Sequence, residues 1–391
     1  MIDYSQFLSP DIVNLPPSGI RKFFDITAEM TGVISLGVGE PDFVTPWAIR
    51  EAGIYSLEKG HTYYTANRGM AELRKEICVY QKRKYDLEYD PLTETLVTVG
   101  GSEAIDALIR AVVAPGDEVL IPEPSFVCYK PCTVMAGGVP VSIQTFEEDN
   151  FKLTPEKLEA CITEKSKLLV LPYPNNPTGA IMTREDLEKI ARVVAKHNLL
   201  VISDEIYGEL TYSGAHTPFA AIEGMKERTV TVNGFSKAFA MTGWRLGYAC
   251  GPSPIIKEMT KIHQYAIMCA PTTSQFAAIE ALRKCDSDVE YMRNEYDHRR
   301  RIMVNGFRDM GLSCFEPLGA FYVFPNISST GLTSNDFATQ LLYDQKVAVI
   351  PGTAFGDCGE GFVRCSYAYS IKNIERALDR IAVFVDKCKN K

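Results

Sequence analysis

The sequence predicts an α/β fold in which helices cover both faces of a mostly parallel β-sheet, with a smaller α+β unit beside it. Three observations lead to this prediction. Short apolar runs alternate with longer amphipathic stretches between about residues 95 and 250. The last third of the chain has a different pattern, with long helices and three short strands. The length of 391 residues fits two closely packed domains better than one small domain.

The predicted strands of the sheet are apolar along their whole length, which is typical of strands buried on both faces. They lie at 96–99, 118–121, 167–171, 199–202, 230–233 and 246–250. After the first strand, apolar residues spaced by three and four positions predict a helix that packs on the sheet. Pro115 and Gly116 end this helix. Its apolar stripe consists of Ile105, Leu108, Ile109, Val112 and Val113.

The smaller unit is predicted from the C-terminal third. A charged helix is expected near 286–310, followed by strands at 321–324, 347–350 and 362–366. The closing helix carries Ile371, Ile374, Leu378, Ile381 and Val385 on one face. The first 40 or so residues are expected to pack on this unit. The predicted domains are therefore residues 47–285, and residues 1–46 together with 286–391.

Composition places the chain among soluble globular proteins, because 46% of its residues are hydrophobic and 23% are charged. Lysine and arginine number 41 against 49 acidic residues, so the net charge of −8 does not favour nucleic acid as a partner. No apolar stretch approaches the roughly 18 residues that span a membrane, and the N-terminus lacks a signal-peptide pattern. The eleven scattered cysteines predict neither a disulfide framework nor a metal site. We expect a reduced, cytoplasmic protein.

A glycine turn joins the first predicted strand to its helix in the segment TLVTVGGSEAIDALIR. Gly100 and Gly101 allow the backbone to approach a ligand, and the free N–H groups of the helix start favour a phosphate. The alternative is an ordinary strand-to-helix turn in which Ser102 caps the helix.

A carboxylate and a phenol follow a buried strand in the segment LLVISDEIYGEL. Asp204 and Tyr207 are three positions apart and would lie on one side of a helical turn. In such a place the carboxylate can pair with a ring N–H⁺, and the phenol can bond a ring oxygen. The alternative is that Asp204 and Glu205 are capping carboxylates in a loop.

Lys237 lies among apolar residues, without an acidic neighbour in the sequence. Burial lowers the pKa of a lysine and makes its amine nucleophilic, as Schiff-base chemistry requires. Arg245 follows eight residues later and has the fork geometry that clamps a phosphate. A surface lysine is the alternative. The apolar neighbours are Phe235, Ala238, Phe239 and Met241.

Two further polar residues stand out. Asn176 lies in the proline-rich turn YPNNPTGA after a buried run, and ligands of open α/β sheets bind at such strand ends. Arg364 is a single charge in the apolar strand FVRCSYA, so it requires an anionic partner. That partner is either a ligand or a carboxylate of a structural salt bridge.

Together and in this order, these motifs resemble those of the class I, fold-type I pyridoxal phosphate (PLP) aminotransferases. The resemblance runs from SLGVGEPDF near residue 35 to VRCSYA near residue 368 and covers nearly the whole chain. It looks closest to the bacterial subgroup of aspartate, aromatic and N-acetyl-diaminopimelate aminotransferases, and SGIRKFFD at 18–25 is similar to the last of these. The family implies a seven-stranded, mostly parallel sheet with helices on both faces, plus a smaller α+β domain.

The resemblance also implies roles around the cofactor ring. Lys237 would form the Schiff base, and Asp204 would pair with the pyridine nitrogen. Tyr207 and Asn176 would bond the ring oxygen, and Phe126 would stack on the ring face. Lys237, Asp204 and Tyr207 are thus the predicted catalytic residues.

Phosphate and substrate ligands follow from the same resemblance. Arg245 and the amides of residues 100–102 would hold the phosphate. Relatives often have a serine where this chain has Gly234, so Ser236 is expected to supply the hydroxyl. Arg364 would bind the substrate α-carboxylate, with the backbone of Gly39 beside it.

Tyr64 lies in a polar loop, where a tyrosine is by default a rim residue. The resemblance implies instead that this loop crosses the two-fold interface of a homodimer. Each active site would then borrow Tyr64 from the other chain to reach the phosphate.

The predicted function is transfer of the α-amino group of an L-amino acid to a 2-oxo acid such as 2-oxoglutarate. Some aspartate-specific relatives have a lysine where this chain has Ser102, so aromatic or other neutral donors are favoured. N-acetyl-diaminopimelate or aspartate aminotransferase activity is the alternative. PLP-dependent C–S β-lyases use the same lysine, aspartate and arginine and are the alternative from another reaction class. A non-catalytic regulator would be expected to carry a DNA-binding domain before residue 35.

Overall fold

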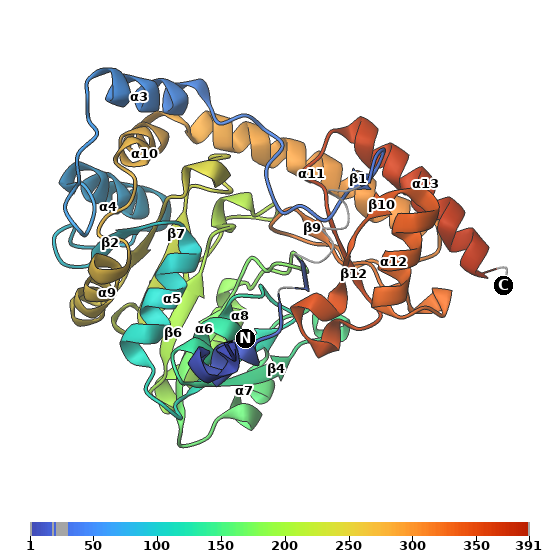
Figure 1. The fold of residues 1–391 in the computed structure, drawn as a ribbon, viewed down its shortest axis with the longest axis horizontal. Helices are drawn as coiled ribbons and strands as arrows, with labels where there is room; N and C mark the ends of the chain where they lie inside the picture. The colour runs from blue at the N-terminus through green and yellow to red at the C-terminus, as the bar shows by residue number, and fades with distance from the viewer. Residues whose placement is uncertain (1, 18, 21–29, 390–391) are drawn as a thin grey trace.

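A seven-stranded β-sheet forms the centre of the molecule in the computed structural model, which describes all residues except 1, 18, 21–29 and 390–391 (Figure 1). The strand order is β2-β8-β7-β6-β5-β3-β4. Strand β8 is antiparallel to both of its neighbours, and all other pairs are parallel. This confirms the predicted mostly parallel sheet. Its strands are β2 (Thr95–Thr98), β3 (Glu118–Glu123), β4 (Val139–Gln144), β5 (Ser166–Leu171), β6 (Leu200–Asp204), β7 (Thr229–Gly234) and β8 (Gly247–Cys250).

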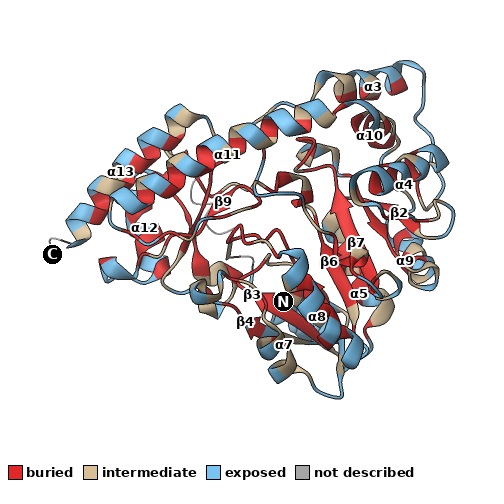
Figure 2. Cartoon of the chain, turned by 180° about the vertical axis from the view of Figure 1, so that it is seen from behind, coloured by how far each residue is buried: buried red, intermediate tan, exposed pale blue. Residues whose placement is uncertain are grey.

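Both faces of the sheet are buried, and Figure 2 colours strands such as β6 and β7 as buried. Alternate side chains of one strand enter different cores. Leu168 and Val170 of β5 pack in the core that contains α5 and α9. Leu169 and Leu171 pack in the core that contains α8. The helices on and around the sheet are α3 (Trp47–Glu58), α4 (Ala71–Tyr85), α5 (Gly101–Val112), α6 (Tyr129–Met135), α7 (Pro155–Cys161), α8 (Arg184–Lys196), α9 (Ser253–Ala266) and α10 (Thr272–Lys284).

The predicted helix after β2 is α5, and its stripe is buried as expected at Ile105, Leu108 and Ile109. The start of α5 is not the one that the alternative predicted, in which Ser102 caps the helix. Gly100, with φ of 80°, is the N-cap residue, and Ser102 already lies inside the helix. The turn therefore depends on a glycine in the left-handed region of φ and not on a serine cap.

The C-terminal third contains helices and two small sheets. Strands β11 (Ile350–Pro351), β12 (Val363–Ser366) and β9 (Tyr322–Val323) form an antiparallel sheet. The predicted strand 347–350 is in fact two strands, because β10 (Val347–Ala348) pairs with β1 (Ile34–Ser35) instead. The helices are α11 (Asp286–Asp309), α12 (Ser334–Gln345) and α13 (Ile371–Lys389).

The N-terminal segment contacts both parts of the molecule. Helix α1 (Pro10–Val13) lies beside α6, next to the large sheet (Figure 1). Strand β1 joins the C-terminal part through β10. Of the segment 18–25, whose sequence resembles diaminopimelate aminotransferases, only residues 19 and 20 are among those described. The domain boundaries 47–285 and 1–46 with 286–391 stay a prediction. Over the described residues, no helix is long and apolar enough to cross a membrane.

Candidate active site

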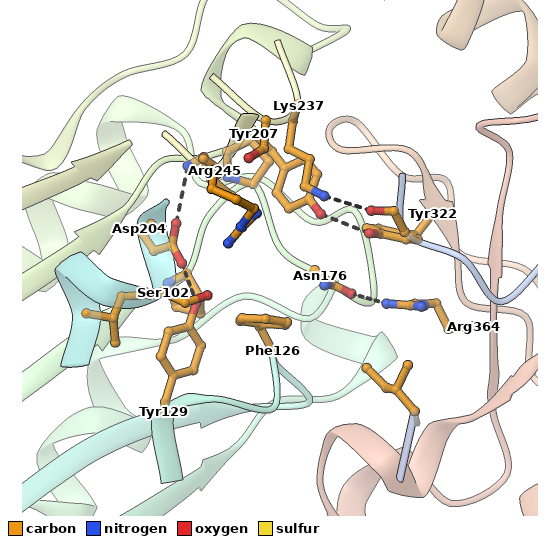
Figure 3. A pocket seen from close by; sticks show the side chains of 18 residues that line it. Ser102, Phe126, Tyr129, Asn176, Asp204, Tyr207, Lys237, Arg245, Tyr322 and Arg364 are labelled. Carbon is orange, nitrogen blue, oxygen red and sulfur yellow. Dashed lines mark hydrogen bonds between the residues drawn. The ribbon is translucent and has the colours of Figure 1, made fainter. Parts of the chain in front are cut away.

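A cavity of about 290 Å³ lies at the carboxyl ends of the parallel strands, where it also touches the C-terminal sheet (Figure 3). Asp204 is the last residue of β6, and Lys237 follows β7. Ligands of open α/β sheets bind at this edge. The cavity collects most of the predicted site residues from distant parts of the chain. Those that line it are Gly39, Gly101, Ser102, Phe126, Asn176, Asp204, Tyr207, Ser236, Lys237, Arg245 and Arg364.

The amine of Lys237 enters the cavity from a largely apolar loop. Its predicted apolar neighbours are all buried, and burial lowers the pKa of Lys237 to about 8. Glu40, which is distant in the sequence, lies near enough to oppose this shift in part. The Lys237 Nζ donates a hydrogen bond of 2.7 Å to the carbonyl of Gly39. The surface-lysine alternative is therefore wrong.

The Asp204 carboxylate is buried at the end of β6. Its Oδ2 accepts a hydrogen bond of 2.7 Å from the Tyr129 hydroxyl, and its Oδ1 accepts one of 3.2 Å from the Ile206 N–H. Burial raises the pKa of Asp204, and these two donors oppose the shift. The backbone contact is of the capping kind that the alternative reading expected, yet the side chain also lines the cavity.

Tyr207 reaches the same cavity by a turn that is not α-helical. The residues after β6 form a turn and a short 3₁₀-helix at Gly208–Leu210, so the predicted helical turn is wrong in detail. The Tyr207 hydroxyl lies 2.9 Å from the hydroxyl of Tyr322, and both rings are buried. Glu205 lies outside the cavity lining and accepts a hydrogen bond from Ser203.

The guanidinium of Arg364 is only 2% exposed and bonds neutral partners. It donates to the Asn176 side-chain oxygen at 2.9 Å and to the Gly37 carbonyl at 2.6 Å. Its Nε has no hydrogen-bond partner. Within the described ranges, no carboxylate forms an ion pair with Arg364. A buried cation without an anion is costly. No salt bridge among the described residues accounts for Arg364, so this arrangement favours an anionic ligand.

Gly101, Ser102, Ser236 and Arg245, the residues expected around a phosphate, all line the cavity. Gly101 and Ser102 open α5, so their N–H groups belong to its unsatisfied first turn. Gly100 does not line the cavity, but its backbone lies against the Arg245 side chain. A Cβ atom added to Gly100 would lie 2.9 Å from the Arg245 Nη2. Arg245 is exposed and donates from Nη1 to the Thr242 carbonyl at 3.0 Å.

Tyr64 lies outside this cavity, with 81% of its surface exposed, on the loop between α3 and α4. Its predicted role toward a partner chain stays a prediction. In the part of the chain that the structure describes, no cluster of His, Cys, Asp or Glu could hold a metal ion.

Sequence reasoning missed two tyrosines that complete the site. Tyr129 holds Asp204, and Tyr322 holds Tyr207. Neither residue interrupts an apolar pattern, so the sequence gives no signal for them. Their partners lie 75 and 115 positions away.

Comparisons with known proteins agree with this geometry. Residues 31–381 match the family model described as aminotransferase class I and II. The chain is 53% identical to a putative aminotransferase, YugH, of Bacillus subtilis, over 98% of this chain and 99% of that protein. It is 48% identical to an aspartate aminotransferase of Pyrococcus abyssi, over 95% of this chain and 96% of that protein. The crystal structure of an aromatic aminotransferase from Pyrococcus horikoshii superposes on this chain with a TM-score of 0.90 and 45% sequence identity. The match covers 94% of this chain and 99% of that chain.

Proposed function

Because the chain belongs to the class I and II aminotransferase family and is an aminotransferase, we propose that it binds PLP in the cavity around Lys237. We propose further that it transfers the amino group of a neutral, preferably aromatic, L-amino acid to 2-oxoglutarate. One observation carries the proposal. Lys237, Asp204 and Arg364 line the same cavity without pairing with one another.

The residues present fit this cofactor. The first turn of α5 and Arg245 would hold the phosphate, with Ser236 supplying a hydroxyl. The buried Asp204 would pair with the ring nitrogen, and Phe126 would cover one face of the ring. Lys237 has the lowered pKa that a Schiff-base lysine needs. Tyr207 and Asn176 would bond the ring oxygen.

Bound PLP supplies an electron sink for the carbanion that forms when the substrate loses its α-proton. The protein supplies orientation and proton transfer. Asp204 would keep the ring nitrogen protonated, because its carboxylate is buried and has no other cation to pair with among the described residues. Arg364 fixes the substrate carboxylate, which sets the direction of the Cα–H bond. With PLP bound, the free Lys237 amine would act as the general base that takes the proton from the substrate Cα.

The preference for neutral donors is supported by the cavity wall. Its basic side chains are Lys237, Arg245 and Arg364, and each already has a proposed task. Ser102 stands where a lysine would bind a distal carboxylate. Ile105 and Pro174 add apolar surface, which suits an aromatic side chain.

A homodimer with shared sites is the proposed assembly. Tyr64 and Tyr63 are 81% and 79% exposed on one loop, and Trp47 at the start of α3 is 57% exposed. Exposed large aromatic side chains of this kind are typical of protein interfaces. In the proposed dimer, Tyr64 reaches the phosphate of the other chain.

A donor panel tests the function. Purified protein with PLP is supplied with single L-amino acids and 2-oxoglutarate, and glutamate formation is measured. We expect kcat/KM to be highest for aromatic donors. A preference of more than about a hundredfold for aspartate over phenylalanine would contradict the donor assignment, as would an acylated diaminopimelate as the best donor. Release of pyruvate and ammonia without glutamate would identify a β-lyase instead.

A further inference from the structure

Tyr322 contacts several groups of the candidate site, although it was not among the predicted site residues. It lies in β9 and is 1% exposed. Its hydroxyl lies 2.9 Å from the Tyr207 hydroxyl, a contact that Figure 3 draws as a dashed line. Its ring centroid is 4.4 Å from the Cζ atom of Arg364. The same side chain therefore touches a proposed cofactor ligand and a proposed substrate ligand.

Either hydroxyl of the Tyr207–Tyr322 pair could be the donor. Burial raises the pKa of both Tyr207 and Tyr322, so both phenols keep their hydrogen at neutral pH. Only one of the two hydrogens can lie between the two oxygens. A Cβ atom built on Gly39 would lie 2.3 Å from the Tyr322 oxygen, so the backbone there covers that hydroxyl. When Tyr322 donates to Tyr207, the hydrogen of Tyr207 is left for a ligand in the cavity.

The ring of Tyr322 supports Arg364 through the strand register. Tyr322 pairs with Ser366 across β9 and β12, which makes Arg364 its diagonal neighbour on the same face of the sheet. Phe355 is a second ring near the guanidinium, with its centroid 4.8 Å from Cζ. Hydrogen bonds to Asn176 and Gly37 complete the contacts of a side chain whose Nε has no partner. Aromatic faces attract a guanidinium and restrict its plane.

We propose that Tyr322 is a positioning residue with two separable tasks: its hydroxyl makes Tyr207 a donor toward the ring oxygen of PLP, and its ring face orients Arg364 toward the substrate carboxylate. This inference rests on the proposed function. The hydroxyl task has a spectroscopic consequence. A phenol that donates to the ring oxygen would stabilise negative charge there, and so would lower the pH at which the absorbance of the bound cofactor changes.

Three variants of the PLP-loaded protein separate the two tasks. Tyr322→Phe keeps the ring and loses the hydroxyl. Tyr322→Leu loses both. Phe355→Leu removes the other ring beside Arg364 and leaves the Tyr207 pair intact. Two quantities are measured: the pH midpoint of the absorbance change of the bound cofactor, and the dissociation constant of 3-phenylpropanoate, a carboxylate without an amino group. Thermal unfolding checks that each variant is folded.

For Tyr322→Phe we expect the midpoint to rise by roughly half a pH unit, because Tyr207 becomes a weaker donor. The dissociation constant should change by less than about twofold, since the ring face remains. Phe355→Leu should show the opposite pattern, with an unchanged midpoint and binding weakened by about fivefold. Tyr322→Leu should show both effects.

The outcomes are distinguishable. An unchanged midpoint in Tyr322→Phe would overturn the hydroxyl task. Equal carboxylate binding by the folded Phe and Leu variants of Tyr322 would overturn the ring task. A wild-type protein without a pH-dependent cofactor band would instead refute the proposed PLP site, and this inference with it.

Discussion

Lys237 is the residue on which the proposed chemistry depends. Its side chain makes one hydrogen bond, to the carbonyl of Gly39, and fills no apolar core. We therefore expect Lys237→Ala to fold normally but to lower kcat by a factor on the order of 10³ or more, because the base and nucleophile are lost. Steady-state rates and thermal unfolding of the purified variant check both parts. Residual activity above about a tenth of wild type would show that another group is the nucleophile.

The lowered pKa of Lys237 predicts a pH dependence for the protein without cofactor. With a pKa of about 8, the amine is mostly protonated below this pH and neutral above it. The rate at which a small acylating reagent modifies the Lys237 amine should therefore rise with pH and reach half its maximum near pH 8. Mass spectrometry of the Lys237 peptide follows this reaction. The same shift makes the folded state gain stability as pH rises from about 8 toward the unfolded value of about 10.4. A midpoint above pH 10 would mean that the amine is not desolvated.

Arg364 should matter only for substrates that carry a carboxylate. Arg364→Ala is expected to lower kcat/KM for an aromatic amino acid by about 10²–10³, because both attraction and orientation are lost. An aromatic amine without the carboxylate serves as the matched substrate. It should be a poor donor for wild type and should lose little more in the variant. Equal losses for the two donors would indicate a purely structural role.

The charged residues and Tyr207 were predictable from the sequence, and the two supporting phenols were not. Lys237 and Arg364 stand out in the sequence because a cation in an apolar run is unusual. Tyr129 and Tyr322 do not stand out, because a buried tyrosine is ordinary in a core. Only the folded chain shows that their hydroxyls meet Asp204 and Tyr207.

Among the elements, the turn from β2 into α5 has a strict backbone requirement near the site. Gly100 has φ of 80° and lies against Arg245. Gly100→Ala should displace the guanidinium and the helix start, and we expect the dissociation constant for PLP to rise by about tenfold. Cofactor fluorescence or equilibrium dialysis measures this.

Gly116→Ala is the matched control for that variant. Gly116 also has a positive φ, of 87°, but a Cβ atom there would meet nothing within 4 Å. It should cost about 1 kcal/mol of stability and leave PLP affinity unchanged. Similar losses of affinity in both variants would show that the effect at Gly100 is general destabilisation.

Elements with uniform burial were predicted well, and elements at edges were not. The runs that became β5, β6 and β7 are buried along almost their whole length. Strand β4 was missed because it is an edge strand whose side chains are mostly exposed or half-buried. The run 347–350 was read as one strand, yet β10 and β11 join different sheets. Pairing partners far away in the chain decide such a split, and apolar periodicity does not report them.

For the whole molecule, the proposed shared sites predict complementation. Lys237→Ala and Tyr64→Ala chains should each have low activity as homodimers. Random pairing of equal amounts makes half of the dimers mixed, and each mixed dimer has one intact site of two, so about a quarter of wild-type activity should return. The two variants are mixed, unfolded and refolded together so that their subunits exchange, and the activity of the diluted mixture is then measured. No gain over the separate variants, or full activity of a monomer at nanomolar concentration, would contradict shared sites.

The pairing of β1 with β10 has a consequence for synthesis of the chain on the ribosome. Residues 34 and 35 pair with residues 347 and 348, which are made much later. The Gly37 carbonyl likewise accepts its hydrogen bond from Arg364, which is also made late. The strands of the large sheet, by contrast, are all made by residue 250. During translation the side of the cavity that contains Arg364 is therefore the last to form, because such distant contacts close only after nearly the whole chain has emerged. A nascent chain that already contains Lys237 and the glycine turn would still lack Arg364 and the contacts that hold it.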